Sequence, residues 1–475
     1  FAENKGKFTV GAKNIEVYNK EGHLVGTSMT KAPMIDFSVV SRNGVAALVE
    51  NQYIVSVAHN VGYTDVDFGA EGNNPDQHRF TYKIVKRNNY KKDNLHPYED
   101  DYHNPRLHKF VTEAAPIDMT SNMNGSTYSD RTKYPERVRI GSGDQYWRDD
   151  NDNRSGLSGA YKYLIAGNTH NQGRTGGGWS SLSGDVRHLG NYGPLPVAGS
   201  SGDSGSPMFI YDKKEQKWLI NGVLRTGHPL EGKENTFQLV RKSYFDEIFG
   251  RDLHTSLYTR AGNGVYTISG NDNGQGSITQ KSGIPSEIKI TLANMSLPLK
   301  DKDEVHNPSY NGPNIYSPRL NNGETLYFMD QKQGSLIFAS DINQGAGGLY
   351  FEGNFTVSPN SNQTWQGAGV HVSENSTVTW KVNGVENDRL SKIGKGTLHV
   401  KAKGINKGSI SVGDGKVILD QQADENNQKQ AFKEVGIVSG RATVQLNSED
   451  QVDPNNIYFG FRGGRLDLNG HSLTF

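Results

Sequence analysis

The sequence contains no cysteine among its 475 residues. Secreted animal proteins normally carry disulfides, whereas a bacterial protein that crosses two membranes before it folds gains from having none. The absence therefore indicates export from a bacterium. The sequence also has no run of 18 apolar residues, so it predicts no membrane span in this chain.

The chain has no excess of either charge, since 51 lysines and arginines balance 51 aspartates and glutamates. Without a basic field or a polybasic run, we expect neither a nucleic-acid partner nor an anionic membrane as a partner. The hydrophobic fraction of 33% is low for a compact globule and fits a thin, elongated core, while 9% aromatic residues argue against disorder. The length allows two or more domains.

The most informative stretch that is present is Gly-Asp-Ser-Gly-Ser-Pro at 202–207, which leads into an apolar run. Its glycines let the backbone turn sharply, so that successive N–H groups point into one hollow. This pattern is typical of the nucleophile of trypsin-like serine proteases. We predict that Ser204 attacks the scissile carbonyl and that the N–H groups of Gly202 and Ser204 form the oxyanion hole. A Ser/Gly turn before a strand is the alternative, because the chain has 56 glycines.

Residues upstream of Ser204 supply the other two members of a catalytic triad in the order His, Asp, Ser. His59 follows hydroxyl and small residues at the end of an apolar run, which is how this kind of fold presents its general base. Asp101 is followed by an aromatic residue and then by Arg-Leu, which resembles the surroundings of the orienting aspartate. Asp100 and Asp118 remain alternatives, and a solvated or turn-capping carboxylate is the simpler explanation for an aspartate in a polar loop.

The primary specificity pocket is expected to have a neutral floor. In the trypsin-like arrangement the residue six positions before the nucleophile lies at this floor, and here it is Ala198. The strand that contains Arg225, Thr226 and Gly227 is expected to pair with the substrate backbone and to form the pocket wall, with Arg225 directed either to the triad or to solvent. We therefore expect an apolar, medium-sized residue such as leucine or methionine before the cleaved bond. One inserted residue in 198–201 would place a different side chain at the floor.

Asp203 needs a partner that trypsin does not use. Trypsin-like zymogens release an amine at an Ile-Val-Gly-Gly start and bury it against the aspartate before the nucleophile, but this sequence has no such start. We therefore expect another group to hold Asp203, and no activation of that kind. The chain begins at Phe1 in mid-pattern, so further residues are expected to precede it.

The pattern of apolar and turn-forming residues changes after residue 255. Residues 1–255 contain short apolar runs between polar, glycine-rich loops, and with the triad order they predict a chymotrypsin-like double β-barrel protease domain that includes one short helix at 242–249. Residues 256–475 contain short strands bounded by Gly, Asn and Asp, as in the coils of a parallel β-helix. A β-sandwich is the alternative. The last residues, 472–475, read as an uncapped strand, so we expect the chain to continue.

Two further patterns carry no site. His96, His103 and His108 crowd around Asp101, but their spacing matches no familiar zinc site. The glycine-rich segment 173–178 lacks the lysine and the helix of a phosphate-binding loop. We therefore expect no metal and no cofactor.

The sequence resembles the secreted passengers of serine protease autotransporters, a family that includes the IgA-specific endopeptidases and the enterobacterial autotransporter toxins. The resemblance lies in residues 1–8, 33–38, 105–116 and 202–207. It implies an all-β chain in which the protease domain is followed by a right-handed parallel β-helix. It also implies that His59, Asp101 and Ser204 are the catalytic residues.

The same resemblance implies properties of a longer protein. These are a longer passenger and an outer-membrane barrel beyond this segment, a secreted or cell-surface location, adhesion, self-association, and release by self-cleavage. Host extracellular proteins and the longer form of the chain itself would be the protein substrates. The alternative function is an adhesin, or a self-associating β-helix protein, whose protease acts only on itself or is incidental.

Overall fold

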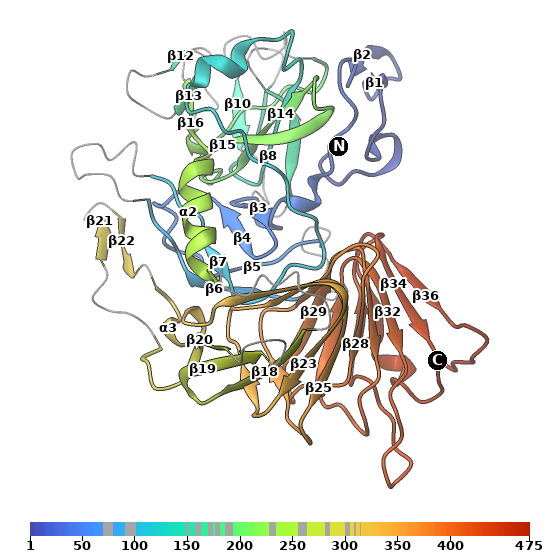
Figure 1. Ribbon diagram of the computed structural model, residues 1–475. Coiled ribbons are helices and arrows are strands. Elements are labelled where there is room, and N and C mark those ends of the chain that lie inside the picture. The colour runs from blue at the N-terminus through green and yellow to red at the C-terminus, as the bar shows by residue number, and fades with distance from the viewer. Residues whose placement is uncertain are drawn as a thin grey trace.

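The computed structural model shows an antiparallel N-terminal region that lies against a parallel C-terminal stack of strands (Figure 1). It describes residues 1–69, 79–90, 101–148, 151, 153–156, 163–169, 174–175, 181–185, 193–227, 234–254, 264–280, 286–299, 305–307, 310–313 and 315–475. Strands make up almost all of the regular structure in these residues. The predicted all-β fold class, with a β-helix after the N-terminal domain, is confirmed.

Two antiparallel sheets form the core of the N-terminal region. In spatial order, the first contains β3 (Ala47–Glu50), β4 (Tyr53–Val55), β7 (Arg106–Leu107), β6 (Tyr82–Lys86) and β5 (Asp65–Val66). The second contains β11 (Ile165–Asn168), β8 (Arg137–Gly141), β14 (Pro207–Asp212), β15 (Lys217–Thr226), β16 (Glu234–Leu239), β13 (Ser181–Asp185) and β12 (Arg174–Thr175). One hydrophobic cluster that includes Val55, Val138 and Phe209 joins the two sheets. This shared core fixes how the loops of one sheet face the loops of the other.

Short elements complete the N-terminal region. They are η1 (Gly6–Phe8), the hairpin of β1 (Ile15–Tyr18) and β2 (Leu24–Ser28), η2 (Phe37–Val39), η3 (Gly125–Ser129), the pair β9 (Tyr146–Arg148) and β10 (Arg154–Gly156), and α2 (Lys242–Asp252). Helix α2 continues beyond the predicted segment 242–249. Its last residue, Asp252, is buried and accepts a 2.6 Å hydrogen bond from the Tyr53 hydroxyl, which ties the end of the helix to β4.

The C-terminal region is built on one 16-stranded sheet in which most neighbouring strands are parallel. Its strands are β17 (Leu253–His254), β18 (Val265–Gly270), β19 (Asn273–Gln280), β20 (Ser286–Asn294), β23 (Thr325–Phe338), β25 (Leu349–Pro359), β27 (Val370–Val372), β28 (Thr377–Trp380), β29 (Arg389–Ile393), β30 (Thr397–Val400), β31 (Ser409–Val412), β32 (Gly415–Leu419), β33 (Val435–Ile437), β34 (Ala442–Leu446), β35 (Ile457–Phe459) and β36 (Arg465–Asp467). The pairs β21 (Val305–Asn307) with β22 (Tyr310–Pro313) and β24 (Ile342–Asn343) with β26 (Trp365–Gln366), and the helices α3 (Pro318–Asn321) and η6 (Pro454–Asn456), lie outside this sheet.

Apolar residues stack from turn to turn along this sheet. Phe355 lies opposite Val378, Val378 opposite Leu398, and Leu398 opposite Val417, and all four are buried. Each turn therefore covers the apolar face of the previous one, which gives a continuous narrow core. The parallel β-helix, here called the solenoid, is thus correct and the β-sandwich alternative is wrong. The sequence did not predict the antiparallel pairing of β18, β19 and β20 at its start.

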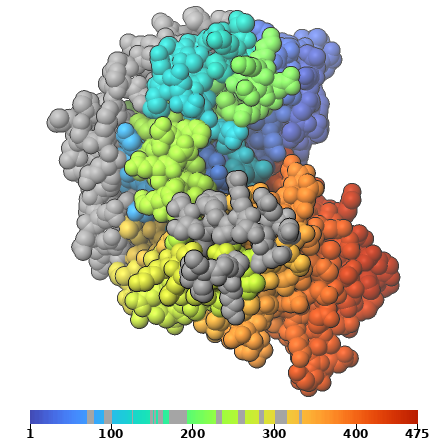
Figure 2. All heavy atoms as spheres, viewed as in Figure 1, coloured from blue at the N-terminus to red at the C-terminus, as the bar shows by residue number. Residues whose placement is uncertain are grey.

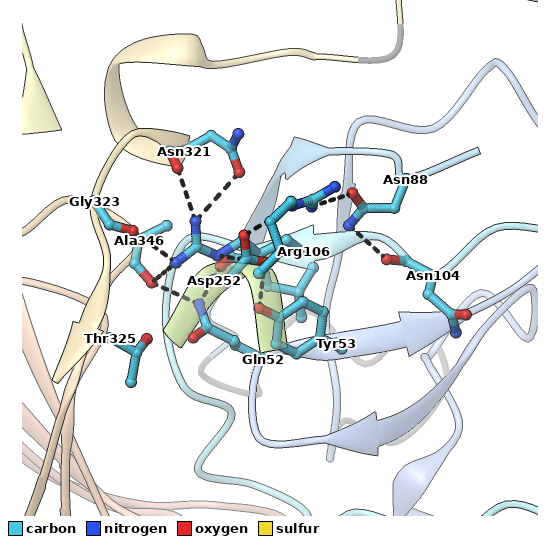
Figure 3. A network of polar contacts seen from close by, with 12 residues as sticks. Gln52, Tyr53, Asn88, Asn104, Arg106, Asp252, Asn321, Gly323, Thr325 and Ala346 are labelled. Atoms are coloured by element: carbon cyan, nitrogen blue, oxygen red, sulfur yellow. Dashed lines mark hydrogen bonds and ion pairs between the residues drawn. The ribbon is translucent and has the colours of Figure 1, made fainter. Parts of the chain in front are cut away.

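Residues 105–113 of the N-terminal region, here called the docking segment, run along the turns of the solenoid. Arg106 is fully buried, and its guanidinium donates to the carbonyl oxygens of Asn321, Gly323 and Ala346 at 2.9, 2.9 and 3.2 Å (Figure 3). Three carbonyl groups of the first solenoid turns are therefore satisfied by one side chain from the other region.

Further contacts continue along the docking segment. The Lys109 ammonium lies 2.8 Å from an Asp388 carboxylate oxygen, and the hydroxyl oxygens of Thr112 and Ser411 are 2.7 Å apart. The space-filling view shows the two regions packed directly against each other (Figure 2). Since the docking segment begins only a few residues after Asp101, the solenoid supports the part of the chain that carries this carboxylate.

The predicted boundary after residue 255 falls within 255–263, outside the described residues, and it stays a prediction. The last described strand before it, β17, already pairs with β23 of the solenoid. Within the described ranges, no helix has the length and apolar character that crossing a membrane requires.

Candidate active site

A short backbone bridge after strand β4 brings the segments of His59 and Asp101 together. Ser56 and His103 exchange backbone N–H···O hydrogen bonds of 3.2 and 3.1 Å. This bridge holds the two segments side by side just before His59 and just after Asp101. The strand end that the sequence identified as the position of a general base is therefore paired with the segment that carries the predicted orienting aspartate.

The side chains of Asp101, His59 and Ser204 form one continuous chain of hydrogen bonds. His59 Nδ1 lies 2.7 Å from Asp101 Oδ2, and His59 Nε2 lies 2.7 Å from Ser204 Oγ. The backbone N–H of His59 donates to the other Asp101 oxygen at 2.9 Å. Asp101 is 1% exposed and the His59 side chain 32%. With an ionised Asp101, the proton of a neutral imidazole belongs on Nδ1, which leaves Nε2 free to accept the serine proton.

The two alternatives for the third member do not take this position in the described part of the chain. Asp118 has a side chain that is 70% exposed, and it pairs with Lys217 at 2.9 Å on the surface. Asp100 lies outside the described residues. The carboxylate that contacts His59 is that of Asp101.

The loop before β14 presents Ser204 and two backbone donors. Gly202 and Gly205 have φ angles of +89° and +86°, a region that favours glycine. In the described part of the chain, neither the Gly202 N–H nor the Ser204 N–H has a hydrogen-bond partner. Two unpaired N–H groups beside the serine hydroxyl are what an oxyanion hole requires.

The same loop is seated tightly on the first sheet. A Cβ atom at Gly205 would lie 2.1 Å from Ser56 Oγ and 2.3 Å from the Val45 carbonyl oxygen, so only glycine fits there. The Asn60 side-chain amide donates to the Ser204 carbonyl oxygen at 2.7 Å. Asn60 follows His59 directly, and this hydrogen bond links the segments of the base and the nucleophile.

Asp203 is buried beneath this loop and has three partners. Its carboxylate accepts from the backbone N–H groups of Gly143 and Ser200 at 2.9 and 2.8 Å. The Arg139 guanidinium lies 3.4 Å from Asp203 Oδ1. The partner that the sequence required but did not identify is therefore Arg139, on strand β8.

Two of the predicted pocket residues lie next to the triad or next to the loop before β14. Arg225 is directed to the triad, with Nε 3.7 Å from Asp101 Oδ2. Gly227 lies against Gly199 and Ser200, since a Cβ atom at Gly227 would come within 2.7 Å of the Gly199 carbonyl carbon. A side chain that enters between these backbones has to separate them.

Two more predicted pocket residues take simpler positions. Ala198 is half-buried, and its carbonyl oxygen accepts a 2.9 Å hydrogen bond from Arg139 Nη1. Thr226 ends β15 and is exposed. Their roles at the floor and wall of the pocket stay predictions.

The histidines near Asp101 have structural environments. His103 is buried, and burial lowers the pKa of its imidazole; His103 Nε2 lies 2.6 Å from the Tyr63 hydroxyl. His108 Nδ1 accepts a hydrogen bond from the Lys83 N–H, and the His108 ring stacks on the Phe80 ring. His96 lies outside the described residues, as does most of 173–178. The described residues contain no group of three or more His, Cys, Asp or Glu side chains that could hold a metal ion.

Two buried arginines escaped the sequence reasoning. Arg87 donates to the carbonyl oxygens of Ala58 and Asn60, on either side of His59, at 2.6 and 2.9 Å. Arg139 contacts residues 198–206, the loop before β14 that is here called the nucleophile loop. The available signal was a basic residue inside or next to an apolar strand, but that pattern is equally typical of a solvent-facing position.

Comparisons with known proteins place the chain in a family. The model of the family described as "Immunoglobulin A1 protease" (Peptidase_S6) matches residues 1–243. Over its whole length the chain is 87% identical to an adhesion and penetration protein autotransporter of Haemophilus influenzae, and 40% identical to an immunoglobulin A1 protease autotransporter of that species. It covers 34% and 29% of these proteins, so it spans about a third of the length of the curated relatives it matches.

Solved structures agree with this result. The crystal structure of the Haemophilus influenzae Hap adhesin matches the whole chain with a TM-score of 0.93 at 86% identity, and 51% of that chain is covered. The passenger domain of the plasmid encoded toxin of Escherichia coli matches with a TM-score of 0.69 at 23% identity over 44% of its length, which shows a shared fold. The autotransporter relatives confirm the predicted secreted or cell-surface location. The chain belongs to the S6 peptidase family, the family of the immunoglobulin A1 proteases.

Proposed function

We propose that the chain is the protease-bearing part of an autotransporter passenger and that it hydrolyses peptide bonds through an acyl-enzyme on Ser204. The observation that carries the proposal is the chain of two 2.7 Å contacts from Asp101 through His59 to Ser204. A serine hydroxyl is a weak nucleophile at neutral pH and needs an adjacent base. His59 is within reach to act as this base, and Asp101 is positioned to orient it.

The proposed reaction runs in two halves. In the first, the Ser204 oxygen bonds to the scissile carbonyl carbon while its proton moves to His59 Nε2. The oxyanion that forms accepts from the N–H groups of Gly202 and Ser204, and His59 then delivers the proton to the leaving amine as the C–N bond breaks. In the second half, a water oxygen bonds to the acyl carbon while one of its protons moves to His59 Nε2. The bond between the acyl carbon and Ser204 Oγ then breaks, His59 returns the proton to Ser204 Oγ, and the acid is released. Asp101 stays ionised and stabilises the imidazolium.

The residue expected at the pocket floor supports a proposal for the substrate class. Ala198 offers no charge that could pair with Lys, Arg, Asp or Glu, so we propose an apolar, medium-sized residue such as leucine or methionine before the cleaved bond. Burial of such a side chain contributes roughly 1.5–3 kcal/mol to binding. To admit it, the contact between Gly199 and Gly227 has to open. The natural substrates would be host extracellular proteins and the longer form of this chain.

A peptide-library cleavage profile tests the proposal. Wild-type chain is expected to cut mainly after leucine or methionine, and Ser204→Ala is expected to leave the library intact. Cleavage after arginine, lysine, aspartate or glutamate would contradict the neutral pocket. Absence of any cleavage by folded wild-type chain, together with a Ser204 that no active-site reagent labels, would contradict the enzyme itself.

The names of two relatives favour a second function, adhesion. The chain is 87% identical to a protein named for adhesion and penetration, and it resembles a structure named as an adhesin. We propose that binding to host surfaces or to other copies of the protein is separate from proteolysis. Ser204→Ala in the full-length protein is then expected to keep cell adhesion and to lose self-cleavage. Loss of adhesion in this folded variant would indicate that adhesion depends on proteolysis.

A further inference from the structure

The nucleophile loop is held from below by one buried guanidinium. Arg139 is 2% exposed at its side chain and Asp203 6%. Besides its 3.4 Å contact with Asp203, the Arg139 guanidinium donates to the Ala198 carbonyl oxygen at 2.9 Å and to Ser206 Oγ at 2.7 Å. Its three contacts therefore lie before, within and after the segment that carries the Gly202 and Ser204 N–H groups.

Glycines at the end of β8 and just after it leave room for the side chains of Arg139 and Asp203. A Cβ atom at Gly141 would lie 2.1 Å from Asp203 Oδ1 and 2.7 Å from Arg139 Nη2, and a Cβ atom at Gly143 would lie 2.6 Å from Asp203 Cγ. Any side chain at either glycine would displace the carboxylate. Arg139 lies opposite Met208 of β14, so the sheet fixes the Arg139 backbone and its guanidinium reaches the loop.

A buried carboxylate without a cationic partner is costly, because desolvation of the charge is not repaid. Asp203 adjoins both oxyanion donors in sequence, so a change in its position moves the Gly202 and Ser204 N–H groups directly. The planar guanidinium can bind several oxygens at fixed angles, which a single ammonium cannot do. Arg139 is thus suited to hold the loop in one conformation.

We propose that Arg139 is a positioning residue that holds the nucleophile loop in its active conformation through Asp203, in place of an amine released by chain cleavage. This inference rests on the proposed protease function. It means that the site is assembled when the chain folds, with no processing of the backbone. Arg139 acts through Asp203 and the loop, and it does not contact the reacting atoms.

Variants of Arg139 and of a matched arginine test the inference with a peptide that the wild-type chain cleaves. Arg137 is the control: it lies on the same strand and is buried, and its guanidinium donates to the Tyr128 carbonyl oxygen rather than to the loop. Arg139→Ala is expected to lower kcat about 10²–10³-fold, as the loss of an oxyanion-hole donor does. KM is expected to change by less than about threefold, because the loss falls on the transition state.

Chemical rescue separates positioning from folding. Methylguanidinium, at concentrations below the unfolding transition, is expected to restore part of kcat in Arg139→Ala and to leave Arg137→Ala and Ser204→Ala unchanged. Urea at a matched fraction of its own transition serves as the solvent control. Wild-type chain refolded from denaturant is expected to regain activity with an unaltered intact mass.

Three results would overturn the inference. One is a folded Arg139→Ala variant with kcat within about threefold of wild type. Another is activity of refolded wild-type chain that appears only after a backbone cut. The third result concerns Arg139→Lys, which is used if Arg139→Ala does not fold. Lysine keeps the charge but cannot contact all three oxygens, so an undiminished kcat in Arg139→Lys would contradict the inference. A wild-type chain that shows neither turnover nor labelling would contradict the proposed function itself. That outcome differs from the three above, in which the wild-type chain is active.

Discussion

The N-terminal region and the solenoid are both built mainly from strands with apolar faces, and the contacts among His59, Asp101 and Ser204 lie in the first of them. In the solenoid, buried apolar contacts are repeated from one turn to the next, as in the series that contains Phe355, Val378 and Leu398. In the N-terminal region, His59, Asp101 and Ser204 come from three separate segments of the chain. The solenoid repeats one kind of packing, whereas loops of the N-terminal region bring different polar side chains together.

The two regions are not independent, because the docking segment joins them. It follows Asp101 in the chain and lies along several turns of the solenoid through Arg106, Lys109 and Thr112. The solenoid therefore supports the same backbone that carries the Asp101 carboxylate. The comparison predicts large effects on activity from the loops, large effects on stability from the junction, and small effects from the exposed face of the solenoid.

The largest expected effect belongs to the loops. Ser204→Ala and His59→Ala are each expected to lower kcat by roughly 10⁶, because triad members act as a unit. Asp101→Asn is expected to lower it by about 10⁴. Ser358→Ala, on the solenoid strand β25, is the control and is expected to keep full turnover. Near-wild-type turnover in a folded Ser204→Ala or His59→Ala variant would show that the site lies elsewhere.

The next effect concerns the junction. The Phe110 ring is fully buried against the side chains of Ala368, Ile393 and Tyr350, and its phenyl group leaves no room for a Cβ atom at Gly369. Phe110→Ala is expected to lower the free energy of unfolding by about 3–5 kcal/mol. Urea denaturation followed by intrinsic fluorescence gives this value.

A matched phenylalanine controls the junction experiment. Phe459 lies on β35 and is 49% exposed, so Phe459→Ala is expected to change the unfolding free energy far less. If both variants unfolded at the wild-type urea concentration, the junction would contribute nothing to stability and the two regions would be separable.

Acid is expected to weaken the solenoid through His371. Burial, followed by repulsion from Lys392, lowers the pKa of His371 to about 4, while Asp414 acts in the opposite direction. The unfolded chain binds a proton near pH 6.5 and the folded chain does so only near pH 4, so stability falls as the pH falls across this window. The loss is at most about 3 kcal/mol.

His371→Phe tests this pH dependence. The replacement keeps an aromatic ring stacked on Tyr350, which lies 4.8 Å from the His371 ring centroid, but it removes the titrating group. The free energy of unfolding measured between pH 7 and pH 4 is expected to fall less in the variant than in the wild-type chain. Parallel curves for the two proteins would assign the acid sensitivity to other groups.

The smallest effect is expected on the exposed face of the solenoid. Lys403 and Glu425 form a 2.9 Å ion pair between neighbouring turns, but both side chains are largely in solvent. Exposed pairs of this kind contribute little, because water and salt screen the charges. Lys403→Ala is expected to leave the melting temperature unchanged within error. A clear decrease would mean that surface pairs help to hold the turns together.

The parts of this structure that the sequence could predict are the local ones. The sharp turn at 202–207 and the strand end at His59 depend on neighbouring residues, and both are present in the structure. The solenoid was also predictable, because short apolar runs bounded by Gly, Asn and Asp recur along residues 256–475. Asp101 could be ranked above Asp118 from its neighbours alone, and it is the one that contacts His59.

Long-range partners could not be predicted in the same way. Arg139 and Asp203 are far apart in sequence, and an arginine that alternates with apolar residues looks like a surface residue of a strand. The junction of Lys109 with Asp388 presents the same difficulty, because nothing local marks a charged residue as buried. The first pair depends on which strands become neighbours in one sheet, since β8 pairs with β14, and the second depends on how the two regions are placed against each other.

The central claim is that Ser204 is a nucleophile activated by His59, and covalent labelling tests it most directly. Folded wild-type chain is treated with a fluorophosphonate and the adduct is located by mass spectrometry of its peptides. We predict a single adduct on Ser204 that is absent from Ser204→Ala and strongly reduced in His59→Ala. A folded wild-type chain that stays unlabelled, or that carries its adduct on another residue, would contradict the account.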